Sequence, residues 1–163
     1  MTYSIANVPL IPQTQDMACW YASAQMLIEW RRMRTQMCEI AHPYPSQVPQ
    51  LEATFAANHG LPFGRTIELA KDLGLTPVPP MTPTPMTLES LLRANGPLWF
   101  AGLFPSGHAV VITGITASHI QINDPWPPNV GQRRSLSYVQ FGATLQPLYG
   151  NTGLTPNLLY FDD

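Results

Sequence analysis

The sequence predicts an α+β domain whose first part is helical and whose second part is an antiparallel sheet. Up to about residue 95, apolar residues recur with helical spacing and several segments end at a glycine. From about residue 96, short runs rich in Val, Ile, Phe and Trp are separated by turn residues. A chain of 163 residues suits one sizeable core. We therefore expect a single domain over residues 1–163, with a helical lobe over about 1–95 and a sheet lobe over about 96–163.

The first predicted helix runs from about Ala18 to Met37. Apolar side chains recur in it every three or four residues, which predicts a buried stripe. Arginines gather toward its C-terminal end, where the helix dipole favours positive charge on a solvated face. The stripe consists of Ala22, Met26, Trp30, Met33 and Met37, and the arginines are Arg31, Arg32 and Arg34.

Two further helices are predicted before the sheet, and both are interpreted as structural. One covers Val48 to Asn58 and ends near Gly60. The other covers Thr66 to Leu73 and ends at Gly74, because glycine readily adopts the backbone conformation that closes a helix.

The segment from Thr76 to Met86 is rich in proline, with five prolines in ten residues. Proline fixes φ and lacks a main-chain N–H, so the segment excludes helix and central strand. We expect an extended crossover between the two lobes. Thr87 then caps a short helix that Gly96 and Pro97 end.

Strand signals follow this helix. The sequence predicts strands over Leu98–Gly102, Ala109–Thr116, His119–Asp124 and Leu158–Phe161, with turns at Ser106–Gly107 and Ala117–Ser118. The segment SLSYVQFGATL, residues 135–145, is ambiguous between strand and helix, and we expect a helix there.

Composition excludes several classes of function. Hydrophobic residues make up 45% of the chain and charged residues 11%, with a net charge of −2, so nothing indicates a nucleic-acid-binding surface. No apolar run approaches the roughly 18 residues of a membrane span, and the first residues, MTYSIANVPL, lack the pattern of an ordinary signal peptide. We expect a soluble protein that acts on a small molecule, a peptide or a protein.

Cys19 lies in the stretch QTQDMACWYASAQMLIEW, at the expected start of the first helix. Main-chain N–H groups in the first turn of a helix have no helical partner, and the positive end of the dipole stabilises negative charge there. Both favour a reactive thiolate and can supply an oxyanion donor. Cys19 is therefore the candidate nucleophile.

The second cysteine, Cys38, is not expected to pair with Cys19, because a helix between them holds them nearly 30 Å apart at about 1.5 Å per residue. Cys38 and His42 have the i,i+4 spacing of half a metal site, but Pro43 and Pro45 interrupt a helix there and no second ligand pair is evident. We expect no disulfide, no metal and no organic cofactor.

The chain offers four histidines as partners for a nucleophilic cysteine. His42 lies in a proline-flanked loop, His59 precedes the end of a helix, and His119 starts a strand after a turn, all of which are typical of surface positions. His108 follows Gly107 and enters a strand, which would fix its backbone and let a substrate approach closely. From this residue alone, a core histidine that bonds a carbonyl is an equally good interpretation.

An acidic residue at a strand end favours the catalytic interpretation of His108. The strand that ends at Asp124 places its carboxyl group on the same face as Ile122, and a carboxyl group at the end of a buried face needs a partner. In an antiparallel hairpin His108 and Asp124 come together, so the carboxylate can orient the imidazole. Asn123 could do the same, although its side chain is expected on the opposite face. Asp124 could instead simply end the strand in a turn.

Three segments in this order resemble papain-like cysteine proteases: QTQDMACWYASAQM, SGHAVVITGI and INDPW. The likeness covers about Val8 to Leu145. It is closer to the compact bacterial branch, which includes effector proteases that plant pathogens inject into host cells, than to the peptidases that remove bacteriocin leaders. It implies the two-lobed papain-like fold, with the nucleophile helix in the helical lobe and the histidine and aspartate in the antiparallel sheet.

Residue by residue, the resemblance implies Cys19 as nucleophile, His108 as general base and acid, and Asp124 as orienting acid. Gln13 matches the glutamine whose amide completes the oxyanion hole beside the Cys19 N–H, with Gln15 as the alternative.

Two features depart from the large members of the family. Asp16 stands where they have a second cysteine, so their structural disulfide is absent here, and Asp124 replaces the commoner asparagine. Trp20 is expected to pack in the interior. Trp126 could screen the His108–Asp124 pair from water or lie on the surface.

The function implied by the resemblance is a cysteine endopeptidase that cleaves a peptide or protein substrate through a thioester. We expect a monomer that acts as a bacterial effector or toxin, made in the cytoplasm and delivered by a specialised secretion system, with an inhibitory immunity partner if it is a toxin. The same triad would also serve a glutamine deamidase, a cell-wall amidase or a transglutaminase-type toxin. A non-catalytic papain-like binding module is a third alternative, and the chain could be the C-terminal module of a larger protein.

Overall fold

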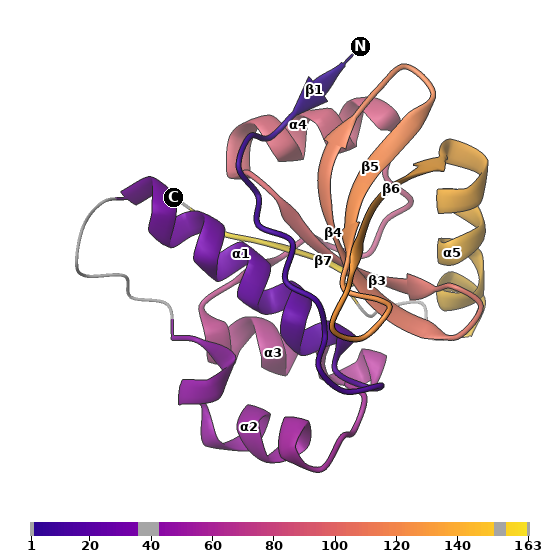
Figure 1. Ribbon diagram of the computed structural model, residues 1–163. Helices are drawn as coiled ribbons and strands as arrows, with labels where there is room; N and C mark the ends of the chain where they lie inside the picture. Colours follow the sequence, from indigo (N-terminus) through magenta and orange to yellow (C-terminus); the bar gives the residue numbers. More distant parts are fainter. Residues whose placement is uncertain (1, 36–42, 152–155, 163) are drawn as a thin grey trace.

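The computed structural model describes residues 2–35, 43–151 and 156–162, which form a seven-stranded antiparallel sheet and five α-helices (Figure 1). The sheet order is β2-β7-β3-β4-β5-β6, and β1 pairs with the far end of β4. The strands are β1 (Tyr3–Ser4), β2 (Thr76–Pro77), β3 (Leu98–Leu103), β4 (Gly107–Ile115), β5 (His119–Asp124), β6 (Gln132–Ser137) and β7 (Leu158–Tyr160). The helices are α1 (Cys19–Thr35), α2 (Pro49–Ala56), α3 (Thr66–Leu73), α4 (Pro85–Asn95) and α5 (Tyr138–Asn151), with short 3₁₀ turns η1 (Pro45–Gln47) and η2 (Phe63–Arg65). The α+β prediction is confirmed.

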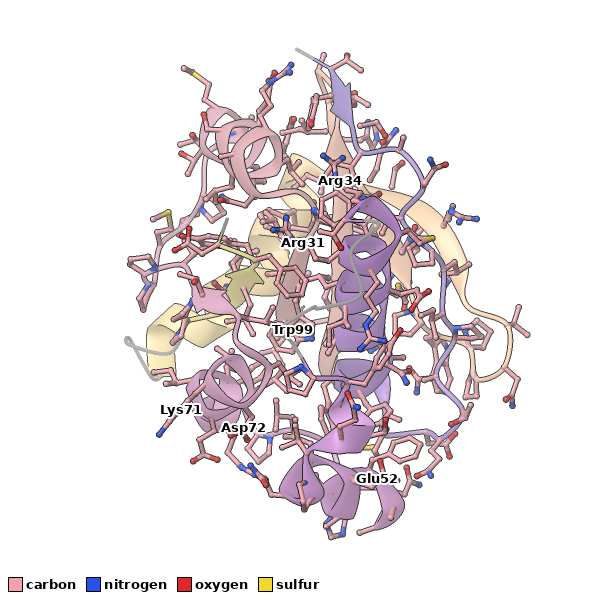
Figure 2. All side chains as sticks on the ribbon, turned by 90° about the vertical axis from the view of Figure 1, so that its left-hand side faces the viewer. Arg31, Arg34, Glu52, Lys71, Asp72 and Trp99 are labelled. Carbon is pink, nitrogen blue, oxygen red and sulfur yellow. The ribbon has the colours of Figure 1, made fainter. Side chains whose placement is uncertain are left out.

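The two faces of the sheet carry separate apolar cores, because alternate side chains of a strand point to opposite faces. On one face Trp99 and Val111 pack with residues of α1, α2 and α3. On the other face Phe100 and Val110 pack with residues of α4 and α5. Figure 2 shows Trp99 inside the molecule, whereas Lys71 of α3 points outward. The sheet is thus covered by helices on both sides.

Helix α1 is buried around most of its circumference in its first three turns. Its buried residues are Trp20, Tyr21, Ala22, Ser23, Ala24, Met26, Leu27, Ile28 and Trp30. The buried part of α1 is wider than the predicted stripe, because the sheet packs against one side of α1 and the other helices of its layer pack against another side. The prediction for Met33 was wrong, since 49% of its surface is exposed. Met37 lies outside the described residues.

Strand β6 (Gln132–Ser137) was not predicted from the sequence. Residues Ser135 to Ser137 of the segment expected to be helical belong to β6, which pairs with β5, and the helix begins only at Tyr138. A reciprocal cap marks this boundary, because the Gln140 N–H donates to the Ser137 hydroxyl and the Ser137 N–H donates to the Gln140 side chain. This Ser-x-x-Gln pattern is a helix-start signal that the sequence already contained.

The proline-rich segment contains two short regular pieces that were not predicted. Its first residues form β2, which is tolerated because β2 is an edge strand of the sheet. Its last residues begin α4 at Pro85, since proline is accepted at the first helical position, where no N–H is needed. The cap is Thr84, whose hydroxyl accepts from the Thr87 N–H across 3.1 Å, so Thr87 is not the capping residue.

The other elements lie close to their predicted positions. The third helix and the strand at His119–Asp124 have the predicted bounds, and the second helix is shorter at both ends. Cys38 and His42, considered above as a half metal site, lie outside the described residues. Among the residues that are described, no helix is both long and apolar enough to cross a membrane.

Candidate active site

Cys19 is the first residue of α1 and is partly exposed at the edge of a cleft. Its Sγ atom accepts a hydrogen bond from the Ala109 N–H across 3.4 Å. Within the described part of the chain, the Cys19 N–H makes no hydrogen bond and stays available as a donor. A negative charge on Cys19 or on a bound substrate atom would therefore meet main-chain donors from α1 and β4.

Two hydrogen bonds fix the start of α1 against the sheet. The buried Ser23 hydroxyl donates to the Ala109 carbonyl across 3.1 Å, and the Trp99 indole N–H donates to the Trp20 carbonyl across 3.2 Å. Both bonds lie within one turn of Cys19, so the position of its thiol relative to β4 is set by buried contacts.

His108 lies between Cys19 and Asp124. Its Nε2 atom is 2.6 Å from Asp124 Oδ1, which leaves Nδ1 as the ring nitrogen available to the nearby Cys19 side chain. Asn123 pairs with Val111, and this register brings Asp124 to the end of β4 that carries His108. The predicted antiparallel hairpin thus joins the two side chains.

The protonation of His108 follows from these contacts. Burial by itself lowers the pKa of His108, but the hydrogen bonds with Asp124 and Cys19 and their charges outweigh it and raise the pKa from 6.5 to about 9. An imidazolium beside Cys19 stabilises negative charge on the sulfur atom. The geometry is that of one imidazole with a thiol on one side and a carboxylate on the other.

Asp124 is 2% exposed at its side chain and is nevertheless held as a carboxylate. Burial opposes its charge, but the hydrogen bond and charge of His108, the Trp126 N–H and the charge of Arg134 together lower the pKa of Asp124. The Trp126 N–H donates to Oδ1 across 3.0 Å, as in a turn closed by an aspartate. Asp124 therefore ends the strand in a turn and binds His108 at the same time.

Arg134 is a member of this cluster that was not predicted from the sequence. Its Nε and Nη2 atoms lie 2.9 and 2.7 Å from Asp124 Oδ2. The signal for it would have been strand β6, because Arg134 faces Ile122 across the sheet and so shares the face of Asp124. The Ala109 N–H was not predicted either, because the residue type at a position does not show whether its main-chain N–H faces the site.

Gln13 has a different environment from the one expected. It is 1% exposed, and its amide nitrogen donates to the carbonyls of Gln15 and Asp16 across 2.8 and 2.9 Å. Both amide protons are thus directed at the loop that leads into α1. Its role as an oxyanion donor stays a prediction, as does the alternative Gln15, whose side-chain oxygen is buried without a hydrogen-bond partner in the described structure.

A cleft of about 940 Å³ opens beside the cluster. Its walls come from the start of α1, the segment around η2, the ends of β3 and β4, and the loop after β5. Apolar side chains such as Met17, Phe63 and Phe104 line it together with Cys19 and His108. The thiol and the imidazole therefore face a space large enough for several residues of an extended peptide.

The remaining candidates lie away from the reacting groups or in supporting positions. His59 and His119 are exposed, as predicted, and Asn123 donates from the opposite face to the carbonyls of Val8 and Pro9. The exposed fraction of Trp20 is 2%, which confirms its packing role. Trp126 lines the cleft and is 45% exposed.

The profile of the family described as papain-like cysteine protease AvrRpt2 matches residues 2–146, which include every residue of the cluster. No curated protein matches the sequence at a significant level.

Proposed function

Because the chain belongs to the family of the papain-like cysteine protease AvrRpt2, we propose that it is a cysteine endopeptidase that uses Cys19, His108 and Asp124 as a triad. The observation that carries this proposal is the placement of one imidazole between a thiol at a helix start and a buried carboxylate. A histidine with only a structural role would not need a nucleophile on one ring nitrogen and an acid on the other.

The first half of the reaction forms a thioester. The Cys19 sulfur attacks the carbonyl carbon of a peptide bond, while His108, positively charged at neutral pH, holds the proton. As the C–N bond breaks, that proton passes to the leaving amine. The acyl group stays on sulfur.

Main-chain N–H groups support the charge that develops on the substrate oxygen. The Cys19 N–H, which has no hydrogen-bond acceptor among the described residues, is the first candidate donor. The Gln13 amide would join it if one of its protons turned away from the loop carbonyls. One such donor contributes roughly 3 kcal/mol to transition-state stabilisation in acyl transfer.

The second half of the reaction releases the acid. Neutral His108 takes a proton from water, whose oxygen attacks the thioester, and the C–S bond breaks to regenerate Cys19. Asp124 stabilises each imidazolium that forms and keeps the ring in place. The residues of the cluster suffice for both halves.

The proposal extends to the biological setting. We place the protein as a bacterial effector or toxin, delivered by a specialised secretion route, with an inhibitory immunity partner where it threatens the producing cell. The support for this setting is the resemblance of the Cys19, His108 and Asp124 motifs.

The test is a search for new protein termini. Purified wild-type protein and the Cys19→Ala variant are incubated with a proteome extract, and new N-termini are labelled and identified by mass spectrometry. The proposal predicts termini that arise with the wild type, are absent with Cys19→Ala, and share a sequence preference. His108→Gln serves as a second inactive variant with an intact thiol.

The same samples identify the competing chemistry. A mass gain of about one dalton on glutamine side chains, as amide hydrolysis to an acid requires, without new termini, would make the protein a deamidase. No difference between wild type and Cys19→Ala in either readout would favour a binding module.

A further inference from the structure

The carboxylate of Asp124 is divided between two sets of donors. Its Oδ1 atom accepts from His108 and from the Trp126 N–H, whereas its Oδ2 atom lies 2.9 Å from Arg134 Nε and 2.7 Å from Arg134 Nη2. One oxygen therefore faces the imidazole, and the other is held by a guanidinium from the neighbouring strand.

We propose that Arg134 is a positioning residue of the site: its two contacts with Oδ2 fix the rotation of the Asp124 carboxylate so that Oδ1 points at His108. The catalytic role of Arg134 in this inference rests on the proposed function, whereas its contacts with Asp124 Oδ2 do not depend on a substrate.

Burial distinguishes this ion pair from an ordinary surface pair. The Asp124 side chain is 2% exposed and that of Arg134 is 36% exposed, so the carboxylate has little access to water and depends on its protein partners. Exposed ion pairs contribute little to the stability of a folded protein, whereas removal of the charged partner of a buried carboxylate strongly destabilises the fold. Two donors on one oxygen also restrict rotation in a way that one flexible ammonium group does not.

Packing keeps the guanidinium in this position. Arg134 lies opposite Ile122 in the β5–β6 pair, on the sheet face that Asp124 shares. Its guanidinium carbon is 5.8 Å from the centroid of the Phe104 ring, and this ring also packs edge-to-face with the His108 ring at a centroid distance of 5.7 Å. Phe104 thus lies near both Arg134 and His108, the two side chains that contact the Asp124 carboxylate.

Removal of Arg134 has a defined electrostatic consequence. The charged and hydrogen-bonding groups that face Asp124 are His108 from β4, Arg134 from β6 and the Trp126 N–H from the following loop. The charge of Arg134 is one of the contributions that oppose burial and lower the pKa of Asp124. Without it, Asp124 takes up a proton at higher pH, and a protonated Asp124 no longer stabilises the His108 imidazolium.

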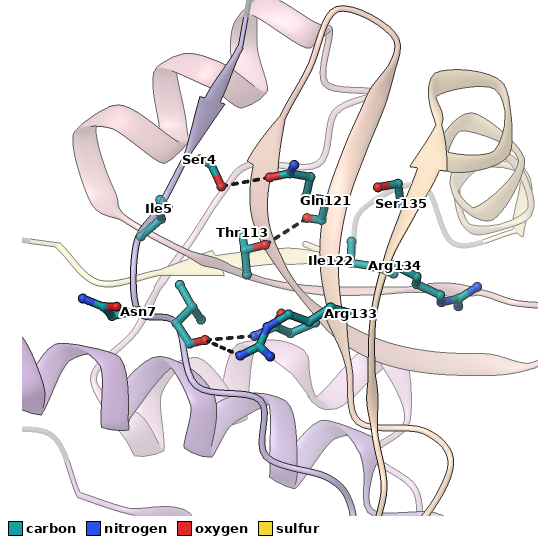
Figure 3. A pocket seen from close by; sticks show the side chains of 11 residues that line it. Ser4, Ile5, Asn7, Thr113, Gln121, Ile122, Arg133, Arg134 and Ser135 are labelled. Carbon is teal, nitrogen blue, oxygen red and sulfur yellow. Dashed lines mark hydrogen bonds between the residues drawn. The ribbon is translucent and has the colours of Figure 1, made fainter.

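The neighbouring arginine provides a matched control. Figure 3 shows the Arg133 side chain directed toward the N-terminal segment, whereas Arg134 points away from it. Arg133 is exposed and donates to the Val8 carbonyl across 3.4 Å, and within the described structure it contacts no carboxylate. Arg133→Gln and Arg134→Gln therefore remove the same charge from adjacent residues of one strand.

Two measurements test the proposal, and neither requires a substrate. In the Cys19→Ala protein labelled at aspartate carboxyl carbons, NMR follows the titration of Asp124. In the protein with Cys19 intact, mass spectrometry follows the alkylation of Cys19 by iodoacetamide at pH 7. We expect Arg134→Gln to move the Asp124 titration to higher pH and to slow alkylation by about ten- to a hundredfold, the range for a misplaced supporting group. Arg133→Gln should leave both unchanged.

Arg134→Lys is the conservative variant. It keeps the charge but offers one ammonium in place of the two-donor contact, so the Asp124 titration should stay near that of the wild type while alkylation slows. If Arg134→Gln fails to fold, this variant decides the question, because alkylation at the wild-type rate would overturn the positioning role. Identical titration and alkylation in Arg133→Gln and Arg134→Gln would overturn it as well. Absence of peptide cleavage alongside the expected shifts would refute the endopeptidase function and leave the role of Arg134 intact.

Discussion

The Ala109 N–H donates to the Cys19 sulfur across 3.4 Å, although the two residues are 90 positions apart in the chain. The carbonyl of Ala109 accepts the Ser23 hydroxyl, one turn further along α1. A single residue of β4 therefore holds the nucleophile helix at two points. The alignment of thiol and imidazole follows from this contact, because His108 immediately precedes Ala109.

Ser23→Ala tests the contribution of this contact to stability. The Ser23 side chain is fully buried, and its loss removes one hydrogen bond from the Ala109 carbonyl. We expect the free energy of unfolding to fall by about 1 kcal/mol, measured by urea denaturation. Ser4→Ala, which removes an exposed hydroxyl, should change it by less than about 0.5 kcal/mol. Equal stability of the two variants would show that the Ser23–Ala109 bond does not hold α1 in place.

His108→Gln should slow the reaction of Cys19 with iodoacetamide at pH 7. The imidazolium that stabilises negative charge on sulfur is lost, and glutamine carries no charge to replace it. Mass spectrometry separates Cys19 from Cys38, whose alkylation serves as an internal reference. A Cys19 rate that is unchanged by the substitution would remove His108 from the role of activating partner.

The pH dependence of stability should reveal the His108 imidazolium. Its pKa is raised from 6.5 in the unfolded chain to about 9 in the folded protein, so the stabilisation is fully present below pH 6.5 and is lost as pH rises through about 9. At about 1.4 kcal/mol per pH unit the full loss is on the order of 3 kcal/mol. Urea denaturation of wild type and His108→Gln between pH 6 and 10 measures it.

Two controls accompany the pH series. The wild type should lose its advantage over His108→Gln as the solution becomes alkaline, and a constant difference would contradict the raised pKa. The Cys19→Ala protein should show a smaller alkaline loss, because Cys19 is one of the groups that raise the pKa of His108.

Gln13→Ala should destabilise the protein, because the buried Gln13 amide nitrogen donates hydrogen bonds to the main-chain carbonyls of Gln15 and Asp16. We expect a loss of about 1–3 kcal/mol in the free energy of unfolding, since the two carbonyls lose their donor. Gln15→Ala is the matched control and should be close to neutral, because the Gln15 side-chain oxygen has no hydrogen-bond partner in the described structure. Wild-type stability in Gln13→Ala, combined with impaired peptide cleavage, would instead favour a role confined to the oxyanion hole.

Local sequence signals were sufficient to predict most helices and strands of the fold. Gly74 ends the third helix in the left-handed conformation that glycine favours, and the strand at His119–Asp124 was predicted from its apolar residues and the Ala117–Ser118 turn before it. β6 was missed because its residues are mostly polar, with Arg133 and Arg134 among them. These residues form a strand because they pair with β5, and no local sequence pattern predicts that pairing.

The sequence by itself determined the α+β class and the candidates Cys19, His108 and Asp124, because helix starts, strand ends and motif likeness are properties of short segments. The tertiary structure decided what surrounds them. It brought Ala109 to the sulfur and Arg134 to the second carboxylate oxygen, and it turned the Gln13 amide toward its own loop. These contacts join segments distant in the chain or depend on one side-chain rotation, so they are set by packing and strand register, which the amino-acid pattern of one segment does not contain.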